Sequence, residues 1–483
     1  MPTTRLQAKR ARQSEVNQRP LVGINRLPSE VLSEIFLICD RTRGSLDGNW
    51  NPFVCQIVFP SICRYWRKVA LSTIALWTRV TLLDRPPWHF SKLCLLRSGS
   101  TALLDINLGM EGKFWAETED HTWEECAQRT RDAFDFIVEH GGVPSRWRTF
   151  TTVTDILSAQ LVVIGFLGKA HFPSLTSLDM TLNVSDVYGY ANGFTLGELE
   201  QSSPRILFQG PLPRLRSVKL ECVPNSYLFG HRLHPQLVGL SHLEIHFEGL
   251  YPSLADFNKM LVANPNLETL TVNTEMIIGP VGVDRGLPKA QLPMLQSLSF
   301  VKVASSFWTL HAIAMLDVPN LISLELTLSI SPYLGGEEGG IRKLLDHIIG
   351  DQSQATPEAR FPSLRSLTLA SAMQPGFEHD IAAVLAAYPQ LTSLTLPTCP
   401  SLSPLFKRPW LAPGIERLWV GVKDLVQLKN VVHSRCKAGL PLRTVLVDNL
   451  ELREKVKSND RARLRKYVDF ALVLGDGERM DDD

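Results

Sequence analysis

The chain reads Phe361-Pro362-Ser363-Leu364-Arg365-Ser366-Leu367-Thr368-Leu369 at the start of a unit that recurs along most of its length. A proline two residues before the first leucine ends a preceding helix and favours an extended backbone. The strand that follows has a side-chain period of two, so the leucines three and five positions after Leu364 share one buried face. Ser366 and Thr368 are therefore expected on the opposite face of the sheet.

Ten such units follow one another, each with an apolar residue at its first, fourth and sixth positions. Seven of the nine intervals between successive units are 24 to 28 residues long, which is the period of a leucine-rich repeat. One unit alone buries too little apolar surface to be stable, so stacking must make a continuous core. The units begin at Leu175, Leu215, Leu240, Leu267, Leu295, Leu321, Leu364, Leu391, Ile415 and Leu442.

The segments between these strands have helical periodicity. Leu254, Phe257 and Leu261, for example, fall on one face of a helix. This alternation of strand and helix resembles the ribonuclease-inhibitor-like class of leucine-rich repeats. The resemblance implies an α/β solenoid with parallel strands on the concave side and helices on the convex side. Helices are expected over 251–261, 307–316, 341–349, 379–388 and 425–436.

A second pattern lies near the N-terminus, where the chain reads Ile24-Asn25-Arg26-Leu27-Pro28-Ser29-Glu30. Pro28 suits the first turn of a helix, because its missing N–H is not needed there, and Glu30 suits the positive end of the helix dipole. We expect two or three helices packed along one apolar seam, with a polar surface loop over 40–56 between them. The seam residues are Val31, Leu32, Ile35 and Phe36, followed by Ile62, Trp66, Val69 and Ala70.

This opening, followed by Cys63-Arg64-Tyr65-Trp66 and by Leu76-Trp77, resembles an F-box over roughly residues 22–80. The resemblance implies docking on a Skp-type adaptor and, through it, on a cullin scaffold. The chain would then be the substrate receptor of a Skp-cullin-F-box ubiquitin ligase, with repeats that bind an unknown target protein. The alternative is a leucine-rich-repeat scaffold or inhibitor without a ligase role. The residues that match the family's adaptor-binding motif are Leu27, Pro28, Glu30, Leu32, Ile35 and Trp66.

The two patterns divide the chain into six expected segments. The stretch after the F-box-like helices carries the repeat spacing only faintly, which is typical of units that cap the end of a solenoid. The segments are a disordered basic arm (1–21), the F-box-like helical domain (22–80), a linker with degenerate capping repeats (81–160), the repeat solenoid (161–450), a capping helix (451–475) and an acidic disordered tail (476–483).

Composition limits the functions that the chain can have. Its formal net charge is +1, which gives no electrostatic case for nucleic acid or a membrane surface as partner. The 8 cysteines have no Cys-x-x-Cys spacing, which is typical of reduced thiols in a cytoplasmic or nuclear protein. The sequence contains no nucleophile elbow, P-loop, His-Glu-x-x-His or dinucleotide fingerprint. We therefore expect an adaptor protein with no cofactor and no catalytic residues.

Candidates for target binding lie on the expected concave face. His242, Glu244 and His246 alternate along one strand and should point to the same side. Residues two apart on a strand are separated by about 6.7 Å, whereas zinc ligands lie about 2 Å from the metal. This spacing disfavours a metal site and leaves a polar surface strand or a partner contact. Arg417 and Trp419 are of the types that dominate many interfaces, although Trp419 packed under the C-terminal helix is an alternative.

Overall fold

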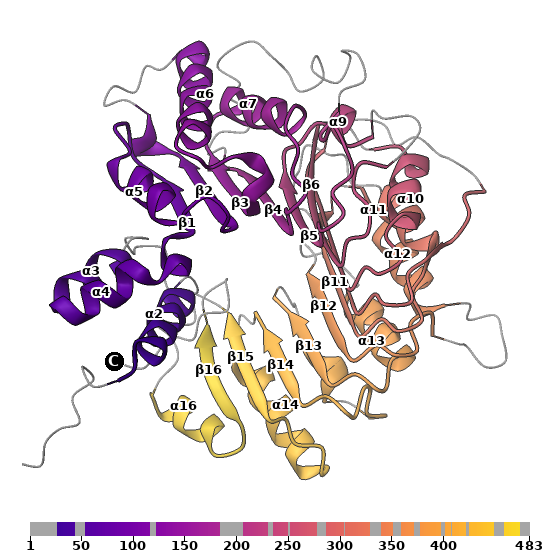
Figure 1. The fold of residues 1–483 in the computed structure, drawn as a ribbon. Coiled ribbons are helices and arrows are strands. Elements are labelled where there is room, and N and C mark those ends of the chain that lie inside the picture. The colour runs from indigo at the N-terminus through magenta and orange to yellow at the C-terminus, as the bar shows by residue number, and fades with distance from the viewer. Residues whose placement is uncertain are drawn as a thin grey trace, which may run out of the picture. The chain divides into compact units, whose positions relative to one another are not determined.

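The computed structural model divides the chain into two compact units, Met1–Thr154 and Asp155–Asp483, which we describe separately (Figure 1). The arm expected over 1–21 and the tail expected over 476–483 lie outside the described residues. The structure describes residues 27–43, 54–115, 122–183, 206–229, 235–249, 252–277, 286–303, 305–328, 340–350, 359–370, 377–397, 401–406, 408–421, 425–448 and 458–473.

The first unit begins with a small group of packed helices. The carbonyl of Pro28 accepts the first helical hydrogen bond, from Leu32 N at 3.0 Å, so the proline stands immediately before the helix. Cys63 caps a later helix, since its Sγ accepts a hydrogen bond from Trp66 N. The elements are α2 (Ser29–Arg43), α3 (Val54–Ile62), α4 (Arg64–Ser72) and the 3-10 helix η2 (Ile74–Trp77).

Aromatic packing joins these helices. The ring of Phe36 on α2 stacks on Phe59 of α3, with centroids 4.2 Å apart, and lies 5.0 Å from the ring of Trp66 on α4. The indole of Trp77 is completely buried and donates a hydrogen bond to the carbonyl of Ala70 at 2.8 Å. Aromatic pairs of this kind contribute about 0.5–1.5 kcal/mol beyond the apolar area that they bury.

The polar loop expected over 40–56 is wrong at both ends, and its middle, 44–53, lies outside the described residues. Residues 40–43 complete α2 and residues 54–56 begin α3. Asp40 is buried, where its carboxylate accepts a hydrogen bond from Gln56 Nε2 at 3.4 Å and faces Arg79 at 3.4 Å. The polar residues of this stretch therefore do not all indicate a surface loop, because Asp40 and Gln56 pair with each other inside the first unit.

Three parallel strands complete the first unit, in the order β1-β2-β3. All three occur where the repeat spacing in the sequence is faint. The elements are β1 (Arg79–Leu82), α5 (His89–Arg97), β2 (Leu104–Met110), η3 (Gly112–Phe114), α6 (Trp123–Glu139), η4 (Pro144–Arg146) and β3 (Trp147–Thr154). A capping box between Thr122 and Glu125 starts α6.

The second unit is built on a single sheet of parallel strands whose leucines stack in register. Leu324 lies beside Leu298 on one neighbouring strand and beside Leu367 on the other. The same position is buried in every unit of the sequence pattern. The strands, in spatial order, are β4 (Ser177–Leu182), β5 (Ser217–Glu221), β6 (His242–Gly249), β7 (Thr269–Ile277), β9 (Ser297–Val303), β11 (Ser323–Leu328), β12 (Ser366–Ala370), β13 (Ser393–Leu396), β14 (Arg417–Val420), β15 (Thr444–Asp448) and β16 (Asp469–Val473).

Helices return the chain between most of these strands, and the five that the sequence predicted are present. Within the second unit the strands line the inner side of a curve, and the helices from α10 to α14 lie on its outer side (Figure 1). A two-stranded pair, β8 (Ala290–Gln291) and β10 (Leu316–Asp317), lies apart from the main sheet. The helices are α7 (Leu157–Leu167), α9 (Asn225–Phe229), α10 (Leu254–Val262), α11 (Ser306–Ala314), α12 (Gly340–Ile349), α13 (Phe377–Ala387), η5 (Ser403–Leu405) and α14 (Leu425–Lys437).

A buried asparagine joins two successive units. Asn264 is completely buried, and its Nδ2 donates hydrogen bonds to the carbonyls of Leu237 at 2.9 Å and Met260 at 2.7 Å. Its Oδ1 accepts a hydrogen bond from Leu240 N at 2.8 Å. Because buried backbone groups must be satisfied, this side chain links the end of α10 to the loop that precedes β6.

The prediction of one long helix over 451–475 is wrong. Residues 458–465 form the short helix α16 (Ser458–Arg465), and residues 469–473 form β16, which pairs in parallel with β15. Phe470 is buried, as are the residues after it up to Val473, so this segment covers the end of the leucine core. A strand also satisfies the backbone groups along the edge of β15, which a helix could not do.

We predict that Leu324→Ala and Leu367→Ala will each lower the free energy of unfolding by about 2–5 kcal/mol, because both side chains are almost fully buried. Urea denaturation followed by circular dichroism measures this loss. Ser366→Ala, on the opposite face of the same strand, serves as control and should change stability by less than about 0.5 kcal/mol. Equal effects of the leucine and serine substitutions would contradict the proposed core.

Candidate functional site

The residues matched to an adaptor-binding motif separate into buried and accessible ones. Leu32 is completely buried and Trp66 is 8% exposed, so both belong to the helical core and can affect a partner only by shaping the surface. Pro28 and Glu30 are exposed, and Leu27 and Ile35 are partly exposed. Tyr65 Oη donates a hydrogen bond to the Leu27 carbonyl at 2.7 Å, which holds the chain just before α2 against α4.

Helix α2 is apolar on two faces. Leu32 and Phe36, four residues apart, face the core, whereas Val31, Ile35 and Ile38 follow one another at the spacing of a second face. Val31 and Ile38 are 45% and 50% exposed. The single seam predicted from the sequence was therefore wrong, because it assigned both sets to one face.

Helix α3 repeats this feature. Ile57, Val58 and Ile62 are between 43% and 51% exposed, although Ile62 had been expected in the seam. Single exposed apolar residues are ordinary, but several on two packed helices are typical of a docking surface. We call Leu27, Pro28, Val31, Ile35, Ile38, Ile57, Val58 and Ile62 the N-terminal apolar surface.

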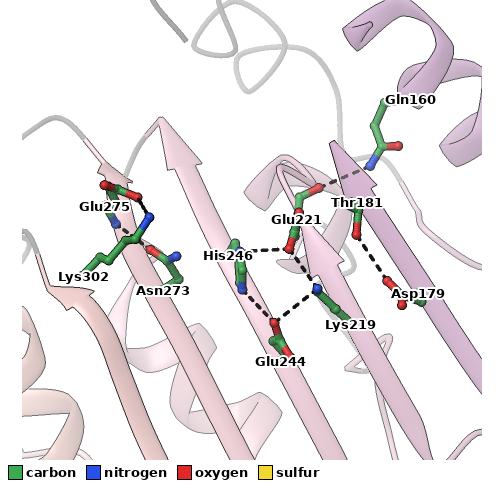
Figure 2. A network of polar contacts seen from close by, with 10 residues as sticks. All are labelled: Gln160, Asp179, Thr181, Lys219, Glu221, Glu244, His246, Asn273, Glu275 and Lys302. Carbon is green, nitrogen blue, oxygen red and sulfur yellow. Dashed lines mark hydrogen bonds and ion pairs between the residues drawn. The ribbon is translucent and has the colours of Figure 1, made fainter. Parts of the chain in front are cut away.

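A second candidate site lies on the inner face of the second unit, on β4, β5 and β6 (Figure 2). Parallel pairing sets Lys219 beside Asp179 on one side and beside Glu244 on the other. Two residues further along, the same register sets Glu221 beside His246. We call these five residues, Asp179, Lys219, Glu221, Glu244 and His246, the concave cluster.

Ion pairs link four members of the concave cluster. Lys219 Nζ lies 3.1 Å from Glu221 Oε1 and 3.6 Å from Glu244 Oε1. The His246 ring stands between the same two acids, with Nε2 2.9 Å from Glu244 Oε1 and Nδ1 3.3 Å from Glu221 Oε1. Each ring nitrogen of His246 thus faces a carboxylate oxygen.

Asp179 stands apart from this network. The hydroxyl of Thr181 donates to its carboxylate at 3.4 Å, and within the described part of the chain no cation lies at ion-pair distance from it. Burial raises the pKa of Asp179, which the positive charge of Lys219 offsets only in part. Among the described residues, Asp179 is therefore a partly desolvated carboxylate without a direct counter-ion.

Glu244 and Lys219 are stabilised in their charged forms. The hydrogen bond from His246 holds the pKa of Glu244 below its usual value, against the effect of burial. Burial by itself would lower the pKa of Lys219, but the hydrogen bond to Glu221 and the neighbouring acidic charges outweigh it, so the pKa is raised. The cluster thus carries three carboxylates against one lysine and a histidine.

Three members of the cluster are of metal-ligating types. One ligand atom from each of Glu221, Glu244 and His246 lies within 4.8 Å of the others, so the set could approach a divalent cation. The sequence argument that residues two apart cannot meet was wrong for Glu244 and His246, because side chains of this length converge although their Cα atoms do not. However, the two acids face opposite nitrogens of one ring, and Lys219 already supplies the cation between them. The donor set is therefore better suited to a network of ion pairs.

The remaining sequence candidates do not join this cluster. His242 is exposed, and its Nδ1 lies 2.9 Å from the hydroxyl of Thr269. Arg417 and Trp419 lie on β14, where Arg417 is exposed and Trp419 is partly buried beside Thr395 and Leu446. The indole nitrogen of Trp419 is buried without a hydrogen-bond partner among the described residues.

Asp179, Lys219 and Glu221 were not among the candidate site residues predicted from the sequence. The signal was available, because Glu221 and His246 both stand six residues after the first leucine of their units. Parallel strands in register bring equal positions of successive units side by side. Comparison of equal positions, rather than of neighbours along one strand, would have identified the cluster.

An open cavity of about 930 Å³ lies beside the loops that precede β5 and β6. Its wall includes Phe208, Pro211 and Pro235, together with Arg216. The guanidinium of Arg216 donates to the carbonyls of Leu215 and Gly239 at 2.8 Å and 3.3 Å, so it links the loop before β5 to the loop before β6. This cavity is therefore built chiefly from loop backbone and apolar side chains.

Neither a family model nor a curated protein matches this sequence. Among the described helices, none has both the length and the apolar character needed to cross a membrane. The case for function therefore depends on the N-terminal apolar surface and on the concave cluster.

We predict opposite effects for two isosteric substitutions in the cluster. The folded-state pKa of Glu244 is lowered, so its charge stabilises the protein above the unfolded pKa of about 4.5 and this contribution is lost as the pH falls through the folded value. Glu244→Gln should cost about 0.2–1 kcal/mol at pH 7, because the group is partly exposed. The folded-state pKa of Asp179 is raised, so its charge costs stability at neutral pH and Asp179→Asn should be stabilising.

Thermal unfolding between pH 4 and pH 7 tests this pair. Both differences from the wild type should shrink towards pH 4, as the carboxyls become protonated in the wild type. A destabilising Asp179→Asn substitution at pH 7 would contradict the assignment of an uncompensated charge.

Proposed function

We propose that this chain is the substrate-recognition subunit of a Skp-cullin-F-box ubiquitin ligase. The helices of the first unit would dock on a Skp-type adaptor, and the inner face of the second unit would bind the target protein. One observation carries the proposal: Leu27-Pro28 stands immediately before α2, which begins with Ser29-Glu30 and is apolar on two faces, one buried and one accessible. A helix that serves only its own core needs one apolar face.

The energetics favour a partner at this surface. A fully buried Val, Leu or Ile side chain contributes about 1.5–3 kcal/mol relative to an exposed one. Val31, Ile38, Ile57, Val58 and Ile62 each keep about half of their surface exposed. Covering these side chains on binding therefore supplies a favourable free energy, which offsets the entropy cost of association.

The mechanism that fits this arrangement is proximity. A receptor that holds its target beside a ligase-bound ubiquitin donor raises the effective concentration of a target lysine near that donor. The chemistry belongs to other subunits, so the receptor needs a docking surface and a binding face. Such a receptor works in the cytoplasm or the nucleus, where the ubiquitin machinery is located.

A second candidate function is a repeat scaffold or inhibitor without a ligase role. The concave cluster favours it as much as it favours a receptor, since both bind a protein on the inner face. The two proposals differ in the first unit alone, where the scaffold would use the helices only as a cap. Direct measurement of adaptor binding therefore separates them.

We predict that Val31→Asp combined with Ile38→Asp will weaken binding to a purified Skp-type adaptor at least tenfold, which is about 1.4 kcal/mol. The reason is that a charge at an apolar contact must be desolvated without a partner. The replacement of Leu27 and Pro28 by alanine should weaken binding as well. Isothermal titration calorimetry with the full chain measures these changes.

Val426→Asp is the matched control, because Val426 is 56% exposed on α14 of the second unit. It should leave adaptor binding unchanged. Circular dichroism verifies that all variants are folded. If the folded Val31 and Ile38 variant binds the adaptor as well as the wild type does, the proposed ligase role is wrong.

A further inference from the structure

The loops that start three successive repeats of the second unit surround an open cavity of about 930 Å³. This volume lies in the range of about 300–1,000 Å³ that ligand pockets have in proteins. The lining residues belong to the repeats that begin at Leu215, Leu240 and Leu267 and to the segment before the first of them. No member of the concave cluster is among them, so the cavity is a separate feature of this unit.

Apolar side chains that water can reach form much of the cavity wall. Val238 is 50% exposed and Ile206 is 36% exposed, although both are aliphatic. The backbone N–H of Phe208 donates to Gln236 Oε1 at 2.9 Å, which links the segment before β5 to the loop before β6. The wall also contains Pro211, Pro213 and Pro235, whose rings restrict the backbone. A partner that covers this wall therefore buries apolar surface at little cost in protein entropy.

One basic group lines the cavity in a braced orientation. Arg216 is exposed, and its Nη1 donates to the carbonyls of Pro213, Leu215 and Gly239 at 3.2, 2.8 and 3.3 Å. Nε and Nη2 of the same guanidinium have no partner among the described residues. These two nitrogens carry the pair of parallel donors that binds a carboxylate. Arg216 therefore presents an anion-binding edge that the second unit leaves unused within the described residues.

One acidic group lines the other end of the same row. Glu268 occupies in its repeat the position that Arg216 occupies two repeats earlier. Ser241 lies between them, since Ser241 N donates to the Arg216 carbonyl and Glu268 N donates to the Ser241 carbonyl, both at 2.8 Å. Neighbouring strands are about 4.8 Å apart, so the two backbones are separated by about 9.6 Å. Glu268 is exposed and its carboxylate has no partner among the described residues.

We propose that the cavity binds a short extended segment of a partner protein, which carries an acidic and a basic side chain three residues apart with apolar residues between them. Arg216 and Glu268 are the only charged residues of the described chain that line the cavity, so the segment complements both. In a polyproline helix, residues three apart point to the same side and are separated by about 9.3 Å, which matches the row between these two residues. The apolar residues lie against the wall around Val238.

A segment bound at this edge is a contact beyond the proposed function, which places target binding on the inner face and gives the loops before the strands no role. A ligase receptor and a repeat scaffold could both use the cavity, so adaptor binding does not bear on it. All the residues that line it belong to the second unit. Its test is therefore a direct measurement of peptide binding.

The probe is the peptide Gly-Asp-Leu-Pro-Arg-Gly, with a neutral fluorophore at its N-terminus and an amide at its C-terminus. Fluorescence anisotropy with the full chain should show saturable binding. Arg216→Gln and Glu268→Gln should each weaken binding about tenfold, because each removes one charge-assisted contact.

A second peptide, with Asn in place of Asp, identifies which charges meet. It should bind the wild type about tenfold more weakly, a comparison that needs no variant. For this peptide the effect of Arg216→Gln should disappear, whereas that of Glu268→Gln should persist. A merely structural effect of Arg216→Gln on the loops would weaken both peptides alike.

Two matched variants test whether the cavity itself is responsible. Arg365 occupies the same repeat position as Arg216 and donates from Nη1 to the Leu364 carbonyl at 3.3 Å, but it does not line the cavity. Val262 on α10 is 52% exposed, close to the value for Val238. Arg365→Gln and Val262→Asp should change peptide binding by less than about threefold, whereas Val238→Asp should weaken it about tenfold.

Circular dichroism verifies that the variants are folded, and sedimentation velocity measures the oligomeric state. Absence of saturable peptide binding to the wild type would overturn the inference. So would equal weakening by the cavity variants and their matched controls, or an effect of Arg216→Gln that is the same for both peptides. A dimer that Val238→Asp dissociates would also overturn it, because a second copy of the chain would then occupy the cavity.

Discussion

The structure of the second unit depends on one constraint, the in-register pairing of parallel strands from successive repeats. Each repeat presents a few leucines that it cannot bury alone, and the next repeat covers them at the same positions, as Leu298, Leu324 and Leu367 do. The apolar core is thus continuous although each unit is small. Asn264 adds a polar link between two successive repeats, since it satisfies backbone groups of the loop in the preceding repeat.

The same register that buries the leucines determines the chemistry of the inner face. Side chains at equal positions of neighbouring units come to lie side by side, so Asp179, Lys219 and Glu244 form a row across three strands. Charges separated by 40 or 25 residues along the chain become partners in this way. A binding face on such a sheet is formed by side chains from several neighbouring strands. Its specificity therefore depends on the order of the repeats along the chain.

The repeat period was sufficient to predict the strands and the helices α10 to α14, because the spacing of apolar residues along the chain indicates which face of an element is buried. The repeat period failed where an apolar stretch suits both a helix and a strand, or where apolar residues occupy both faces of one helix. The apolar run that ends at Val473 became a strand because the edge of β15 offered hydrogen bonds and an uncovered core. Val31 and Leu32 are neighbouring aliphatic residues, yet only Leu32 is buried in the core that holds Phe36, Phe59 and Trp66.

The sequence by itself determined the class of the fold, the positions of the repeats and the two regions in which binding residues should be sought. Only the tertiary structure decided which apolar side chains of α2 remain accessible and which charged side chains meet. His246 joins Glu221 rather than His242, although His242 is nearer in the sequence. The physical reason is that hydrophobic periodicity repeats along the chain, whereas ion pairs and docking surfaces form between strands and helices that only folding brings together.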